Sequence, residues 1–187
     1  MASSKVEIAN IALVGLRAAV INSFSDGTTE ANAVNVIWDT VRQSELAKHP
    51  YNFAMKRATL NRLVSTPAFG YAYQYQLPVD CLRVWRVDGH YDYRIEGNKL
   101  LTDETSAKIV YVYDNEDITT WSSMFSDLVA ARMRVELAYT LAADETLIRL
   151  SKELYDRKLV QVKYVDSSQD FTDQFSQQSS TLIGVRY

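Results

Sequence analysis

Three acidic residues crowd a short loop behind a strand-like segment: Asp114, Glu116 and Asp117. Two neighbouring carboxylates can hydrolyse a glycosidic bond, one as the acid and the other as the base or nucleophile. Acidic side chains in loops are more often simply solvated, and the same holds for Asp103 and Glu104. The loop therefore predicts a glycan-degrading hydrolase only as an alternative function.

Other chemistry-bearing residues are few and scattered. Cys81 is the only cysteine, and its place beside Leu82 on a strand favours a buried thiol over a nucleophile paired with a distant histidine. His49 and His90, the two histidines, do not lie at metal-ligand spacing, and the six glycines form no phosphate-binding loop. The sequence predicts no catalytic residue, cofactor or metal, and hence no enzyme.

The arginines and tyrosines raise the question of nucleic acid. Arg83 and Arg86 on one strand, with Arg57 and Arg62 before it, could contact phosphates, and the twelve tyrosines could stack on bases. However, the net charge is −3, and the strand tyrosines alternate with glutamine instead of lysine or arginine. We expect the arginines to form ion pairs and the tyrosines to serve subunit interfaces, with a nucleic-acid-binding module as a further alternative.

Hydrophobic periodicity predicts an α+β fold. Apolar residues recur at helical spacing near both ends of the chain and alternate along strands in the middle. We expect a four-helix bundle with an inserted antiparallel β-meander. The helices are predicted at about 4–15, 29–48, 122–142 and 145–166, the strand-rich insertion at about 51–115, and its strands at 69–77, 82–87, 91–95, 98–102 and 107–113. Residues 51–63 are ambiguous, and strand is favoured over helix there.

The segment 121–143 is apolar enough to raise the possibility of a membrane span. Arg132, Arg134 and Glu136 lie at its centre, where each charge would cost about 2.5–3.5 kcal/mol in hydrocarbon. The segment is therefore expected to be a helix buried in protein, and no membrane association is predicted. A single domain should cover residues 1–168.

The last residues, 169–187, form a polar arm with apolar side chains spaced along it. Such a composition cannot build a core, yet it is too apolar for a solubilising tail. The arm is predicted to dock on a partner, and folding back on its own domain is the alternative. The partner-binding residues would be Phe171, Phe175, Leu182, Ile183 and Tyr187.

An ordered series of short motifs resembles the podovirus tail tubular protein A family over about residues 5–165. Tyr51 departs from the pattern, where the family has a tryptophan, but both are large interfacial aromatics. The motifs are Ile8-Ala9-Asn10 with Gly15, the Ser-Asp-Gly-Thr-Thr-Glu-Ala run at 25–31, His49-Pro50-Tyr51-Asn52-Phe53, Phe69-Gly70-Tyr71, Tyr75-Gln76-Leu77-Pro78, Asp80-Cys81-Leu82-Arg83-Val84, Glu96-Gly97, and Trp121 with Phe125.

The resemblance implies a structural virion protein, the head-to-tail adaptor of a short-tailed phage. Such proteins self-associate into a ring, typically a dodecamer, below the portal protein. The helical part and the arm would bind the portal, and the other end would seat the tail nozzle, a protein like tail tubular protein B. Genome DNA would pass through the lumen without specific binding. Assembly would take place in the host bacterial cytoplasm, and the protein would end in the virion tail.

Overall fold

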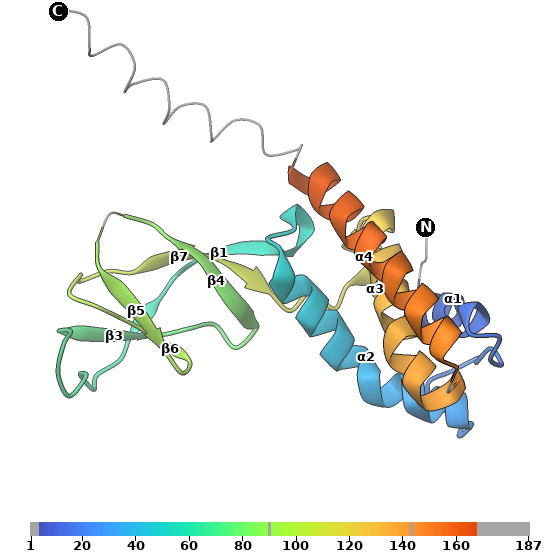
Figure 1. Cartoon of the computed structure of the whole chain (residues 1–187). Helices are drawn as coiled ribbons and strands as arrows, with labels where there is room; N and C mark the ends of the chain where they lie inside the picture. Colours follow the sequence, from blue (N-terminus) through green and yellow to red (C-terminus); the bar gives the residue numbers. More distant parts are fainter. Residues whose placement is uncertain (1–3, 90, 143, 168–187) are drawn as a thin grey trace, which may run out of the picture. The chain divides into compact units, whose positions relative to one another are not determined.

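The computed structural model describes residues 4–89, 91–142 and 144–167, and it divides the chain into two compact units (Figure 1). Met1–Trp38 and Trp121–Tyr187 form one, which we call the helical unit. Asp39–Thr120 form the other, the sheet unit. The chain thus leaves the helical unit within one helix and returns to it after the last strand.

The helical unit is built around α3 (Ser123–Leu137), which packs against α1 (Lys5–Gly15) and α4 (Glu145–Ser167). Serine caps begin two of these helices: the Ser4 hydroxyl accepts from the Glu7 amide at 3.2 Å, and that of Ser122 accepts from the Phe125 amide at 3.2 Å. Each satisfies an amide that has no partner within the helix. Most of α3 is buried, as its apolar residues on several faces require.

The side chain of Arg134 approaches the end of α1 so closely that only glycine fits there. A Cβ at Gly15 would lie 2.9 Å from Cδ and Nη1 of Arg134 on α3. The same arginine donates from Nε to the Ser151 hydroxyl on α4 at 3.0 Å, which ties α3 to α4. Gly15 therefore leaves room for a side chain that joins two other helices.

The sheet unit holds two antiparallel sheets. One has the order β1-β7-β4 and the other β2-β3-β6-β5. The strands are β1 (Met55–Thr59), β2 (Asn61–Arg62), β3 (Tyr73–Gln76), β4 (Cys81–Val87), β5 (Tyr93–Glu96), β6 (Lys99–Thr102) and β7 (Lys108–Tyr113), and short 3-10 helices lie at Asn52–Ala54 and Ile118–Thr120.

The two sheets share one apolar core. Ile109 on β7 pairs with Ala58 on β1 and with Val87 on β4, and these side chains point into the core. The other sheet contributes Tyr75 and Leu100, both essentially fully buried. Alternation along a strand sends the intervening residues of β1, β7 and β4 to the opposite face, which we call the outer face.

The predicted four-helix bundle with an inserted β-meander is wrong, although the α+β content is correct. A meander pairs strands that follow one another, but β3 pairs with β6 and β4 with β7. Only β2 with β3 and β5 with β6 pair in chain order. The remaining helix, α2 (Thr29–Lys48), is divided between the two units at Trp38, so it does not complete a bundle. Strand alternation reveals that a strand exists, whereas its partner depends on which apolar faces can close a common core.

The strand preference for residues 51–63 is confirmed by β1 and β2. Among the residues that the structure describes, no helix is both long and apolar enough to cross a membrane. The predicted arm, 169–187, lies outside the described residues.

Candidate functional site

The acidic loop of the sheet unit is held by a buried arginine. Arg42, on the second half of α2, is only 2% exposed. Its Nη1 forms an ion pair with Asp114 Oδ1 at 2.8 Å, although the angles of this contact are not those of a hydrogen bond. Its Nη2 donates a hydrogen bond to Asp114 Oδ2 at 3.3 Å. Gln43 also donates to Asp114 Oδ2, at 2.8 Å. Asp114 thus neutralises a cation that would otherwise be buried without compensation.

The other two loop carboxylates have separate roles. Asp117 accepts from the Thr119 amide at 3.0 Å and from the Thr119 hydroxyl at 2.6 Å, so it caps the short helix at Ile118–Thr120. Glu116 reaches Arg42 Nη2 only at 3.5 Å, and its side chain is 78% exposed. Two of the three carboxylates therefore hold the loop together: Asp114 through Arg42 and Gln43, and Asp117 through Thr119.

The loop with the other two acids, Asp103 and Glu104, is held by the side chain of Asp103 and by the backbone of Glu104. Asp103 Oδ1 accepts from the Ala72 amide at 2.7 Å, and the Glu104 carbonyl accepts from the Tyr75 hydroxyl at 2.7 Å. Both contacts fasten the loop after β6 to β3 and the turn before it.

Asp80 is held by two side chains of the first sheet. Lys56 Nζ lies 2.8 Å from Oδ2, and the Tyr111 hydroxyl donates to Oδ1 at 3.1 Å. Burial opposes ionisation of this carboxyl, but the hydrogen bonds from Lys56 and Tyr111 and the charge of Lys56 outweigh it and lower its pKa. In turn, burial and the bond to Asp80 raise the pKa of Tyr111 to about 12. This network joins β1, β7 and the turn before β4.

Cys81 is unsuited to nucleophilic chemistry. Burial, and then the negative charge of Asp80, raise the pKa of the half-buried thiol to about 11. A thiol with that pKa is almost entirely protonated near neutral pH. The His49 ring lies against Tyr51, with 4.9 Å between centroids, and His90 is outside the described residues. Over the described part of the chain, no group of acids, histidines and cysteine could hold a metal ion.

The expected ion pairs of the arginines are wrong at three of the four positions. Within the described ranges, Arg57, Arg62 and Arg83 lie within ion-pair distance of no carboxylate. Arg62 instead stacks over Tyr73 and Arg83 over Trp85, each with 5.0 Å from guanidinium carbon to ring centroid. Cation–π contacts of this kind leave the guanidinium able to bind an anion at its edge.

The outer face of the first sheet brings together two of these arginines and a lysine that the sequence analysis missed. Arg57 and Arg86 flank Val110, and Lys108 lies two residues from Val110 on the same strand. The alternation of Lys108 with buried Ile109 could have placed the lysine on this face, but not beside the arginines.

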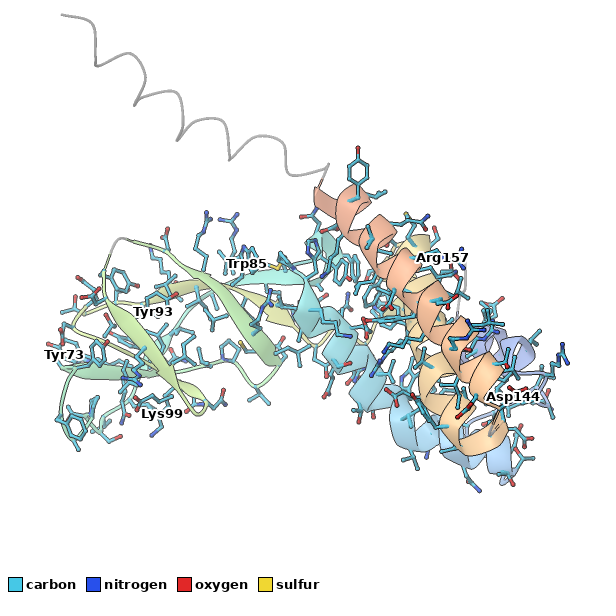
Figure 2. The ribbon with its side chains drawn as sticks, in the orientation of Figure 1. Tyr73, Trp85, Tyr93, Lys99, Asp144 and Arg157 are labelled. Atoms are coloured by element: carbon cyan, nitrogen blue, oxygen red, sulfur yellow. The ribbon has the colours of Figure 1, made fainter. Side chains whose placement is uncertain are left out.

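The tyrosines divide between the core and the surface. Tyr75 and Tyr111 are buried in the shared core, so the expected interface role does not apply to them. Tyr93 on β5 (Figure 2) is 43% exposed, and Tyr164 on α4 is 77% exposed. Only such exposed rings are available to a partner.

Exposed apolar side chains lie along one side of α4, where the exposed, charged Glu153 and Arg157 separate the first of them from the others. Leu150, Val160 and Tyr164 lie on the same side of the helix, and they are 46%, 69% and 77% exposed. We call these residues the α4 apolar face. Periodicity alone could not have identified these residues, because it does not distinguish an apolar stripe that is covered from one that is exposed.

The five predicted partner-binding residues of the arm, Phe171, Phe175, Leu182, Ile183 and Tyr187, all lie outside the described residues. Neither a protein-family model nor a curated protein matches this chain.

Proposed function

We propose that the chain is a structural adaptor, the head-to-tail ring component of a short-tailed phage. In this role copies of the chain assemble into a ring between the portal protein and the tail nozzle, and the ring forms part of the conduit for the genome. The ordered motif series across residues 5–165 is the basis for naming this class of protein.

The observation that carries the proposal is the α4 apolar face and its position in the chain. Leu150, Val160 and Tyr164 expose large apolar side chains on the helix that leads directly to the predicted arm. Val160 and Tyr164 are one helical turn apart, so their exposed side chains are neighbours, and adjacent exposed apolar groups are typical of protein–protein interfaces. The last turns of α4 and the arm would therefore form one continuous binding element, which suits attachment to a portal.

The loop carboxylates support an adaptor more than a hydrolase. Asp114 compensates buried Arg42, and Asp117 caps a helix, so both have structural reasons to be present. No specific observation favours glycan cleavage as a second function.

The test is capture of purified portal rings of the same phage. The full chain should retain portal, whereas a chain that ends at Ser168 should not. Serine substitution of the arm's apolar residues should have the same effect as truncation, because the arm would order on its partner through those side chains. The substituted residues are Phe171, Phe175, Leu182, Ile183 and Tyr187.

A matched control replaces Gln174, Gln177 and Gln178 of the arm with asparagine, and this variant should still bind. Equal capture by the truncated and full chains would contradict the role of the arm. Absence of the chain between portal and tail nozzle in images of assembled particles would contradict the adaptor function as a whole.

A further inference from the structure

The outer face of the sheet β1-β7-β4 is basic over one end. Arg57 on β1 and Arg86 on β4 are both paired with Val110 of the central strand, and Lys108 is paired with Thr59. Residues directly opposite one another in antiparallel strands project to the same face. The side chains of Arg57, Arg86 and Lys108 therefore stand together, away from the core, and we call them the basic triad.

The basic triad surrounds a hollow of about 200 Å³ whose floor includes Val110 and Ile109 of the central strand. Asp88 is the only acidic residue among those that line it. All three triad residues are exposed, so their charges are accessible from solvent. Positive charge that exceeds negative charge around a surface hollow selects an anion.

Two members of the triad lack a compensating carboxylate. Within the described parts of the chain, neither Arg57 nor Lys108 lies within 4.0 Å of an acidic side chain, although Lys56 and Lys48 each have such a neighbour. The fold provides acidic partners elsewhere in the sheet unit, at Asp80, Glu45 and Asp114. Arg57 and Lys108 therefore contribute positive charge to this face on a chain whose net charge is −3.

The size of the hollow and the spacing of its cations point to a polymer. Small-molecule sites usually enclose about 300–1,000 Å³, so a hollow of about 200 Å³ suits a single group such as a phosphate. Arg57 and Arg86 are on strands either side of β7, which separates their backbones by about 10 Å. Backbones so far apart allow the two guanidinium groups to contact separate charges, and a polyanion offers such repeated charges whereas one small anion does not.

An exposed aromatic residue favours nucleic acid among the polyanions. Trp85 immediately precedes Arg86 on β4, at a register shift in the pairing with β7, and it is 51% exposed (Figure 2). Bases stack on such rings while arginine and lysine neutralise the backbone. We propose that the basic triad binds the phosphate backbone of a nucleic acid, independently of base sequence. This inference goes beyond the adaptor proposal, in which the genome only passes through, and it does not depend on that proposal.

Contacts of this kind must respond to salt. Each phosphate neutralised contributes about −0.7 to the slope of log affinity against log salt for single strands, and about −0.9 for duplex DNA. Three contacts predict a slope of about −2 for single strands, and therefore about a 20-fold loss of affinity between about 50 and 200 mM salt. A duplex should lose about 40-fold over the same range.

The experiment measures fluorescence anisotropy of labelled single-stranded and duplex oligonucleotides of mixed sequence with the full chain. The test variant carries Arg57→Gln, Arg86→Gln and Lys108→Gln. The matched control removes the same charge from exposed positions of α4, through Arg149→Gln, Lys152→Gln and Arg157→Gln; Figure 2 labels Arg157. We expect binding by the wild type and the control, and a salt slope in the test variant that is smaller in magnitude by about 2–3.

Several outcomes would overturn the proposal. If the wild type shows no anisotropy change at about 50 mM salt, nonspecific binding of the usual strength is excluded. If the control variant loses as much affinity as the test variant, the effect comes from net charge and not from the basic triad. Inorganic phosphate that displaces the oligonucleotide at equal phosphate concentration would indicate a small-anion site. If the triple variant unfolds, as judged by circular dichroism, Arg57→Gln alone must still lower the salt slope by about 1 for the proposal to stand.

Discussion

Removing the Asp114 carboxylate should destabilise the sheet unit strongly, even though the residue lies in a loop. Asp114→Ala deletes the closest negative charge to the Arg42 guanidinium, at 2.8 Å, and the acceptor of the Gln43 amide. Arg42 is 2% exposed, so its charge cannot be rehydrated without local opening of the structure.

The magnitude follows from the burial of each partner. Removing one member of a buried ion pair costs about 3–5 kcal/mol. The Asp114 side chain is 16% exposed in the folded chain. In the variant, Arg42 still has Asp39 and Glu116 as ion-pair partners, and their side chains are 73% and 78% exposed. Such exposed pairs contribute only about 0.2–1 kcal/mol, so they offset little of the loss. We expect Asp114→Ala to lower the free energy of unfolding by about 3 kcal/mol, the lower end of the buried range.

The control is Glu116→Ala, which removes the same charge from the same loop. Its effect should stay below about 1 kcal/mol, because Glu116 is exposed and lies 3.5 Å from Arg42. Urea unfolding, combined with hydrogen exchange of the β7 amides, reports on the sheet unit itself. The double variant with Arg42→Met should lose less than the sum of the single variants, by about 2 kcal/mol. Equal losses for Asp114→Ala and Glu116→Ala, or additive effects in the double variant, would refute the reasoning.

Two further predictions concern titratable groups near the core. The pKa of Asp80 is lower in the folded than in the unfolded chain, so the ionised carboxylate stabilises the fold above about pH 4. This stabilisation is lost as the pH falls through the pKa of the folded state. Asp80→Asn should therefore lower the melting temperature near neutral pH and have much less effect at about pH 2, and an unchanged difference across that range would contradict the assignment. The thiol of Cys81, with a pKa of about 11, should resist alkylation in the folded protein at about pH 8 and should react once denaturant is added. Mass spectrometry measures the extent of alkylation, and rapid alkylation of the native chain would be inconsistent with that pKa.

Local sequence was sufficient for the elements of this fold. Ser4 and Ser122 cap helices that the apolar spacing behind them predicts, and alternation at 107–113 predicts β7. These features depend on contacts within a few residues, where backbone hydrogen bonds and side-chain direction follow directly from residue type. Even the ambiguous stretch at 51–63 could be assigned from the strands around it.

Strand partners and candidate sites depended on the tertiary structure. Whether β3 pairs with β4 or β6 is decided by which arrangement lets both sheets bury their apolar faces in one core, and no local pattern encodes that choice. For the same reason the sequence predicts that Asp114 is a solvated loop acid, whereas in the structure Arg42, remote in sequence, lies beside it.

Local patterns were enough to predict an α+β protein and the approximate positions of most helices and strands, because periodicity and capping depend on neighbouring residues. That Asp114 compensates a buried cation, and that Arg57, Arg86 and Lys108 meet on one face, could be known only from the folded chain. Charges act through space, and the distances between them are set by strand register and packing, which form only when the whole chain folds.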